Sequence, residues 1–375
     1  MDSAIQRLND LGQSVWYDNI SRGVLRTGDL KRLIDLGVSG LTSNPTIFEK
    51  AVAGSDDYDE GVLDLAREGK DADQIYEALV VEDIRAASDL LRPTYDRTDG
   101  ADGYASLEVS PHLASDTQGT VAEAERLFSL LDRPNVMIKV PATPDGIPAL
   151  HKLIGQGINV NVTLTFSLEA YRDVRQAYMA GLEDLSWNGG DLSKVASVAS
   201  FFVSRVDTVV DGQIEEIVRQ GNEDAEDLLG KAAIANARLA YRDFKAAFGG
   251  DRFASLRAKG ARVQRPLWAS TSTKNPAYSD VLYAESLIGA DTVDTMPDAT
   301  LNAVMDHGEA ANTLDQDVEG AERLFEDLED AGISMQQVTG KLLVDGVRSF
   351  ADSFDGLMAN LEEKRSSLLG SAGGR

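Results

Sequence analysis

The segment Asn135-Val-Met-Ile-Lys-Val-Pro-Ala-Thr143 carries a lysine, Lys139, among apolar neighbours. Its β-branched residues and the closing Pro141 predict a short buried strand and not a turn of helix. Burying a charged ammonium group is costly unless it is paired, so such a lysine tends to lose its proton. A neutral lysine is a nucleophile toward carbonyl groups and forms Schiff bases. The alternative is a lysine at a strand end whose ammonium group reaches solvent.

Short apolar runs of this kind recur along the chain and alternate with amphipathic helical patterns. The runs are Val15–Tyr17, Gly40–Thr42, Tyr104–Leu107, Val136–Ile138, Ile158–Val160, Val195–Ala199, Pro266–Ala269 and Thr292–Thr295. The helical patterns include Asp29–Leu36, Val121–Leu131, Ile147–Leu153 and Leu168–Met179. Strand–helix alternation predicts an α/β fold with a parallel sheet. Eight such units predict a single (β/α)8 TIM barrel.

The chain of 375 residues is longer than the ~250 residues typical of such a barrel. The expected additions are helical insertions at about 46–101 and 205–259, a helical C-terminal region over 302–365 and a disordered tail over 366–375. The first insertion is expected to hold two or three helices, including Asp71–Leu91, and the second a long helix, Glu223–Phe248. No linker, repeat or break in composition divides the sequence, so residues 1–375 are predicted to form one domain.

Composition restricts the classes of partner. The chain has 62 acidic and 36 basic residues, a formal net charge of -26, so nucleic acid and anionic membranes are disfavoured as partners. The simplest meaning of this charge is a solvated acidic surface. An anionic substrate would therefore need a local group of cations.

Cysteine and histidine usage restricts the chemistry. The absence of cysteine excludes disulfides, thiolate metal sites and cysteine nucleophiles. The three histidines show no metal-ligand spacing, so we expect no metal cofactor. The start, Met1-Asp-Ser-Ala-Ile-Gln-Arg-Leu8, resembles no signal peptide, and no apolar run approaches the ~18 residues of a membrane span. We expect a cytoplasmic protein.

Polar residues end the predicted strands in succession. They are Asp18, Asn44, Glu108, Lys139, Asn161 with Thr163, Ser200, and Ser270 with Ser272. In a barrel of this kind the chemistry takes place at the C-terminal ends of the strands. The set offers an amine nucleophile, two carboxylates for proton transfer, and amides and hydroxyls that can hold sugar hydroxyls. The alternative for Asp18 and Glu108 is a helix cap or a surface salt bridge.

Two cations follow later strands. Arg205 comes after Ser200-Phe-Phe-Val-Ser204, and Lys274 comes after Ser270-Thr-Ser-Thr273. Each is expected to begin a helical segment, so cation, hydroxyls and helix N-terminus together could hold a phosphate group. The alternative is a pair of ordinary surface cations. The sequence has neither a Walker-type phosphate loop nor a dinucleotide fingerprint.

Five blocks resemble the signature segments of the transaldolase family. They are Leu41-Thr-Ser-Asn-Pro-Thr46, Met137-Ile-Lys-Val-Pro-Ala142, Asn159-Val-Asn-Val-Thr-Leu-Thr-Phe166, Ala199-Ser-Phe-Phe-Val-Ser-Arg205 and Trp268-Ala-Ser-Thr-Ser-Thr-Lys-Asn275. The resemblance implies transfer of a three-carbon dihydroxyacetone unit from sedoheptulose 7-phosphate to glyceraldehyde 3-phosphate. The products would be erythrose 4-phosphate and fructose 6-phosphate, in the pentose phosphate pathway, with no metal or organic cofactor. The insertions and the helical C-terminal region resemble the longer bacterial subgroup.

The resemblance also implies roles for single residues. Lys139 matches the Schiff-base lysine, Glu108 matches the acid/base that works through a water, and Asp18 matches the carboxylate that handles the proton of the hydroxyl beside the cleaved bond. The residues that match contacts to the dihydroxyacetone unit and the catalytic water are Asn44, Asn161 and Thr163, with Ser200 nearby.

At the phosphate end, Arg205 matches the phosphate-binding arginine, and Ser272 is a further expected substrate contact. The second cation is an arginine in many relatives, whereas here the matching residue is Lys274. A lysine keeps the charge but lacks the two-pronged guanidinium, which puts the phosphate affinity at that end in question.

Two other functions are consistent with the same residues. A Schiff-base aldolase would release dihydroxyacetone, but small sugar-aldolase relatives carry a tyrosine where this chain has Phe202, which favours the transferase. A catalytically silent barrel is disfavoured by the intact set of Lys139, Glu108 and Asp18. We expect phosphorylated sugars as ligands and a monomer or homodimer.

Overall fold

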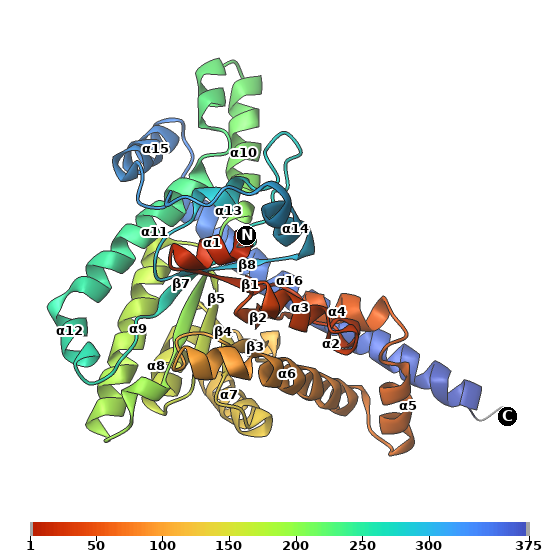
Figure 1. Cartoon of the computed structure of the whole chain (residues 1–375). Helices are drawn as coiled ribbons and strands as arrows, with labels where there is room; N and C mark the ends of the chain where they lie inside the picture. The colour runs from red at the N-terminus through yellow and green to blue at the C-terminus, as the bar shows by residue number, and fades with distance from the viewer. Residues whose placement is uncertain (1–2, 373–375) are drawn as a thin grey trace.

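Eight parallel strands close into a barrel in the computed structural model, which describes residues 3–372 (Figure 1). The strands are β1 (Gln13–Tyr17), β2 (Gly40–Thr42), β3 (Ala105–Glu108), β4 (Val136–Pro141), β5 (Val160–Thr165), β6 (Ser197–Phe202), β7 (Arg265–Ala269) and β8 (Thr292–Met296). Each strand pairs with its neighbours in sequence, and β8 pairs with β1 to complete the ring. The predicted (β/α)8 barrel is confirmed.

Helices surround this ring. Between β1 and β6 they are α2 (Arg22–Thr27), α3 (Asp29–Asp35), α4 (Pro45–Ala53), α5 (Asp59–Arg67), α6 (Ala72–Arg97), η1 (Pro111–Leu113), α7 (Thr117–Leu131), α8 (Gly146–Gly155), α9 (Leu168–Trp187) and η2 (Leu192–Lys194), with α1 (Ala4–Asp10) before β1. After β6 they are α10 (Ser204–Arg219), η3 (Glu223–Leu228), α11 (Ala232–Gly249), α12 (Asp251–Arg257), α13 (Leu282–Ser286), α14 (Asp298–His307), α15 (Val318–Asp330) and α16 (Met335–Ala372). No helix in this described part is long and apolar enough to cross a membrane.

The last helix, α16, packs across other parts of the barrel rather than projecting alone. It contacts α4, α5 and α6, and Figure 1 shows it in blue passing along that side of the molecule. Ser353 accepts a 2.9 Å hydrogen bond from Thr46 in α4. The helix therefore brings residues from the end of the chain to the same side of the barrel as the loops after β2 and β3.

The prediction of a disordered tail over 366–375 is wrong for residues 366–372, which continue α16; residues 373–375 lie outside the described residues. The helix is held just before this point. Lys364 donates to the carbonyl of Ser55 at 2.9 Å, and Arg365 donates to the carbonyl of Lys70 at 2.9 Å. Beyond these anchors Leu368 and Leu369 pack against the main hydrophobic core, which a composition-based argument cannot detect.

The predicted long helix Glu223–Phe248 is also wrong, because it is broken between η3 and α11. Gly230 occupies the break with a φ of 69°, a left-handed conformation that favours glycine. Its backbone N–H donates to the Asp211 carboxylate at 2.9 Å, so the break is fixed by a tertiary contact.

Strands β5 and β6 lie further along the chain than the apolar runs predicted. β5 covers Val160–Thr165 instead of Ile158–Val160, and β6 covers Ser197–Phe202 instead of Val195–Ala199. Both strands are fully buried, yet Asn161, Thr163 and Thr165 alternate with apolar residues in β5, and Ser197 and Ser200 stand among apolar residues in β6. A search for apolar runs therefore ends too early in strands whose inner face is polar.

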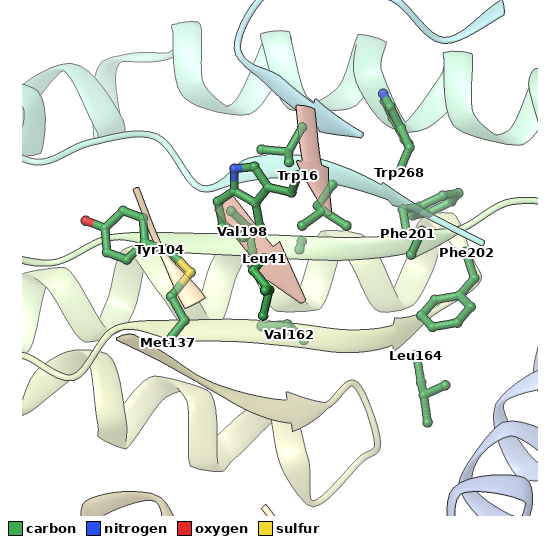
Figure 2. Close-up of a cluster of buried hydrophobic side chains, with 14 of the residues drawn as sticks. Trp16, Leu41, Tyr104, Met137, Val162, Leu164, Val198, Phe201, Phe202 and Trp268 are labelled. Atoms are coloured by element: carbon green, nitrogen blue, oxygen red, sulfur yellow. The ribbon is translucent and has the colours of Figure 1, made fainter. Parts of the chain in front are cut away.

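Trp16 of β1 is completely buried and fills part of the barrel interior. Figure 2 shows this ring near the middle of a buried cluster, with Tyr104 at one end and Phe202 at the other. Its indole N–H donates to Asp102 at 2.8 Å. The ring lies against the backbone of Gly40 in β2, where an added Cβ would lie 2.4 Å from a ring carbon. A residue without a side chain is therefore required on β2 beside Trp16.

Replacing Gly40 by alanine should lower the free energy of unfolding by about 1–3 kcal/mol, because Trp16 is confined on all sides. Gly212 in α10 is the matched control, since an added Cβ there meets nothing within 4 Å. Gly212→Ala should raise stability by about 0.5–1 kcal/mol through helix propensity. Urea unfolding of both variants measures the difference, and a Gly40→Ala protein as stable as Gly212→Ala would contradict the packing described.

Candidate active site

The register of three strands places polar side chains next to one another inside the barrel. Glu108 in β3 pairs with Lys139 in β4, and Lys139 pairs with Asn161 in β5. Neighbours in register in a parallel sheet point to the same face. An acid, an amine and an amide therefore stand side by side.

The amine of Lys139 is buried but has polar partners. The residue is 4% exposed, and its Nζ donates to the carbonyl of Ser43 at 2.9 Å. The same nitrogen lies 3.5 Å from Oε2 of Glu108. The strand neighbours of Lys139 are apolar as expected, but the end of its side chain faces two polar groups, the Ser43 carbonyl and the Glu108 carboxyl.

The carboxyl group of Glu108 is as buried as the amine it faces. Burial raises the pKa of Glu108, and the charge of Lys139 opposes this rise. Oε2 of Glu108 has no hydrogen-bond partner among residues 3–372, because the 3.5 Å contact with Lys139 is long. A carboxyl group in this setting is protonated more readily than an exposed glutamate, so it can both accept and donate a proton.

Asp18 follows β1 and lies on the other side of the same interior. Its Oδ1 accepts a 2.7 Å hydrogen bond from Thr42, which also lies 2.6 Å from the hydroxyl of Thr295. Burial raises the pKa of Asp18, while the Thr42 hydrogen bond and the charges of nearby cations lower it. These cations are Lys139, Lys274 and Arg205. Burial and the neighbouring cations thus act on the pKa of Asp18 in opposite directions.

The amide of Asn161 lies below the cavity. It is completely buried, it donates to Ser106 at 3.1 Å, and it accepts from Ser200 at 2.7 Å. Thr163 on the same strand lines the cavity above it. Asn44 also lines the cavity, and its Oδ1 caps α4 by accepting from the N–H of Ile47 at 3.0 Å.

Arg205 and Lys274 lie at the outer end of the site. Arg205 is the second residue of α10, as predicted, and burial lowers its pKa. Lys274 lies in a loop and does not begin a helix, because Asn275 precedes Pro276 and is disfavoured in a helix. Its pKa is lowered by burial and then by the charge of Arg205. The ammonium of Lys274 also donates to Ser272.

These residues surround one cavity of about 610 Å³, which we call the Lys139 cavity. Its wall contains the following predicted site residues: Asp18, Asn44, Lys139, Thr163, Ser200, Phe202, Arg205, Ser272 and Lys274. The Phe202 ring lies 5.1 Å from Phe166 and 5.3 Å from the Arg205 guanidinium. On the opposite side of Arg205, Phe350 of α16 lies 6.0 Å away and also lines the cavity.

Two residues at or next to this cavity have strained backbone conformations. Leu164 has a φ of 57° at a register shift in β5, and Ser270 has a φ of 59° directly after β7. Such conformations cost a non-glycine residue ~1 kcal/mol or more and tend to occur at functional sites. The shift in β5 lies beside Thr163, so it helps to set the direction of that hydroxyl.

The geometry agrees with comparisons to known proteins. A model of the family described as Transaldolase/Fructose-6-phosphate aldolase matches residues 15–361. A protein named Transaldolase from Trichodesmium erythraeum is 46% identical over 365 residues, which cover 95% of this chain and 96% of the relative. Transaldolase 2 from Streptomyces coelicolor is 46% identical over 375 residues and all of both chains. Transaldolase from Thermobifida fusca is 48% identical over 366 residues, 97% and 99% of the two chains.

This chain belongs to the transaldolase and fructose-6-phosphate aldolase family. The resemblance drawn from its sequence blocks is confirmed. In the part of the chain that the structure describes, no group of three or more histidine, aspartate or glutamate residues could hold a metal ion.

Several residues of the site had not been predicted. Thr295 ends the eighth apolar run and would have been found by applying the strand-end rule to that run as well. Thr42 ends the second run in the same way, and its hydrogen bond to Asp18 places it in the site. Lys50 of α4 and Phe350 of α16 reach the Lys139 cavity from helices, and nothing in their local sequence indicates this.

Asp294 in β8 is a further buried acid. It is fully buried, and Thr271 donates to its Oδ1 at 2.9 Å, while Oδ2 has no partner among the described residues. Burial raises the pKa of Asp294 to about 7, with the Thr271 hydrogen bond opposing and the charge of Asp18 adding to the rise. Asp294 in the unfolded chain titrates near 3.8, so folding favours its protonated form.

The stability contributed by protonated Asp294 should be fully present below about pH 4 and be lost as the pH rises through about 7. Asp294→Asn mimics the protonated form, so it should flatten this decline. At about pH 8 the variant should be more stable than the unmodified protein by on the order of 1–3 kcal/mol. Urea unfolding across this pH range measures the effect, with the exposed Asp330→Asn as control. Parallel curves for Asp294→Asn and the unmodified protein would contradict the assignment.

Proposed function

We propose that this chain is a transaldolase that moves a dihydroxyacetone unit from sedoheptulose 7-phosphate to glyceraldehyde 3-phosphate. The products are erythrose 4-phosphate and fructose 6-phosphate. Full-length similarity to proteins named transaldolase supports this activity. The observation that carries the proposal is a buried amine, Lys139, beside the Glu108 carboxyl and in one cavity with Asp18.

The first step joins Lys139 to the ketone. The neutral amine attacks C2 of the ketose to give a carbinolamine, and loss of one water gives an iminium ion. Protonated Glu108, 3.5 Å from the amine, gives its proton to the oxygen that develops at C2. It then takes the proton that the nitrogen sheds and passes it to the departing hydroxyl, so that one water leaves and an ionised Glu108 faces the iminium. The raised pKa of Glu108 suits it to both transfers.

The second step breaks the carbon–carbon bond. Asp18 accepts the proton of the C4 hydroxyl while the electrons of the C3–C4 bond move toward the iminium nitrogen. The aldehyde product leaves, and a three-carbon enamine stays attached to Lys139. An acceptor aldehyde then enters, the same steps run in reverse, and one water releases the new ketose.

The phosphate group is assigned to the cationic end of the Lys139 cavity. Arg205 is a half-buried cation and Lys274 an exposed one, and both line the Lys139 cavity of a protein with a net charge of -26. Their lowered pKa values reflect burial, and Lys274 is lowered further by the charge of Arg205. A dianion between them would relieve that repulsion and so bind favourably.

Phe202 supports transfer rather than release. Its apolar ring lies between Phe166 and Arg205 and cannot donate a proton to the enamine. An enamine that is not protonated by water waits for an acceptor aldehyde. Aldolase activity, the alternative within the family, would need a proton donor near this position.

Borohydride reduction in the presence of fructose 6-phosphate should leave a stable three-carbon adduct on Lys139. Peptide mass mapping locates the adduct, and Lys139→Met is the control that keeps an apolar side chain of similar length. The variant leaves the buried Glu108 without its cation and should lower the free energy of unfolding, so urea unfolding first establishes that it is folded under the trapping conditions. An adduct on a different lysine, or none, would refute the Schiff-base assignment.

The unmodified protein also allows transfer of the dihydroxyacetone unit to be distinguished from its release as free dihydroxyacetone. Fructose 6-phosphate alone should be consumed slowly, and quickly once erythrose 4-phosphate is added, because only the acceptor removes the enamine. Release of free dihydroxyacetone at the same rate with and without the acceptor would show that the protein is an aldolase.

A further inference from the structure

A second cavity, of about 390 Å³, lies behind β3. Its wall is formed by α6, the loop after β3, α7 and α16, so it is outside the ring of strands that encloses the Lys139 cavity. Val80 and Leu127 line it from α6 and α7, and Phe354 lines it from α16. Glu108 is part of its wall, whereas Lys139 is part of the wall of the first cavity. We call it the Glu108 cavity.

The inner end of the Glu108 cavity carries groups that bind water. The Glu108 side chain is 6% exposed, and its Oε2 is an unpartnered buried oxygen among the described residues. Tyr76 also lines the cavity, and its pKa is raised by burial and then by the charge of Glu108. Tyr76 therefore keeps its hydroxyl proton and adds a second polar group to the wall of this cavity. A polar pair at the end of a cavity larger than several water molecules is a site that water can occupy.

The outer end of the Glu108 cavity is polar and well ordered. Arg126 of α7 lies 2.5 Å from Glu77 of α6 and 2.9 Å from Glu123 of its own helix, and all three line the rim. On the other side His112 lies 2.8 Å from Asp355 of α16. These contacts link α7 to α6, and the loop after β3 to α16, around the opening of the cavity.

The proposed reaction requires water to leave and to reach the imine carbon while a sugar occupies the Lys139 cavity. Imine formation releases one water and imine hydrolysis consumes one, and in both events a phosphorylated sugar fills the Lys139 cavity. The same cavity must exclude water while the enamine waits. A water that enters past the sugar would meet the enamine carbon before it reached Glu108.

We propose that the Glu108 cavity is a water route that supplies and drains the imine chemistry from behind β3, separately from the entrance used by sugars. This inference rests on the proposed function. The departing hydroxyl takes a proton from Glu108, and the water formed in this way leaves between α6 and α7. The water for hydrolysis enters the same way, gives a proton to Glu108 and adds its oxygen to C2. Sugars and water thus reach C2 from different sides.

Exchange of oxygen between solvent and ketose tests this directly. Fructose 6-phosphate without an acceptor is incubated in water labelled with heavy oxygen, and incorporation at C2 is followed by mass spectrometry. Lys139→Ala gives the spontaneous background. Val80→Phe should fill the Glu108 cavity from α6 and slow enzyme-catalysed exchange about fivefold or more, with the KM for fructose 6-phosphate unchanged. Ser129→Phe places the same ring on the exposed face of α7 and should exchange at the unmodified rate.

The outcomes separate the two claims. If the unmodified protein exchanges no faster than Lys139→Ala, the proposed function fails. If it exchanges and Val80→Phe exchanges equally fast, the water route alone is refuted. If Val80→Phe does not fold, Leu127→Phe narrows the cavity from α7 and is judged by the same two rates. A raised KM with unchanged exchange at saturation would also overturn the route, because it would mean that the cavity serves the sugar.

Discussion

The contact between Lys139 and Glu108 is the interaction on which the rest of the site depends. Two groups of opposite charge, each buried, stand 3.5 Å apart because their strands pair in register. A one-residue slip between β3 and β4 would turn one of them to the outside of the barrel. Removing either partner would leave the other unpaired in a buried site, which is strongly unfavourable. The pairing of β3 with β4 therefore fixes both the register of these strands and the partner of the Lys139 amine.

Three buried carboxyl groups share a raised pKa but differ in their neighbours. Glu108, Asp18 and Asp294 all have raised pKa values because they are removed from water, but their neighbours differ. Glu108 faces the amine, and Asp18 is in the positive field of Lys139 and the phosphate-end cations. Asp294 accepts a hydrogen bond from Thr271, and the charge of Asp18 adds to the rise of its pKa. In the proposed function the first two exchange protons with a substrate, whereas Asp294 is predicted to make stability depend on pH.

Much of this arrangement could be predicted from the sequence. Alternating runs gave the barrel, and the polar residues that follow them gave Asp18 and Lys139, because parallel strands present their C-terminal ends at one edge. The depth of each residue could not be predicted in this way. Asn161 is a strand-end amide in the sequence, yet it lies beneath the cavity and supports Ser200. Contributions from distant helices, such as Phe350, depend on how α16 packs and leave no local pattern.

The measurement that tests the account most directly is the rate at which the Lys139 adduct forms in Glu108→Gln. Rapid mixing with fructose 6-phosphate, followed by borohydride quenching, gives this rate for the variant and the unmodified protein. Loss of the carboxyl should slow adduct formation by about a hundredfold or more, since proton transfer by a positioned acid is worth this much. The variant should still bind the sugar phosphate normally, because Arg205 and Lys274 are untouched. Adduct formation at the unmodified rate would contradict the central claim that Glu108 carries the protons for Lys139.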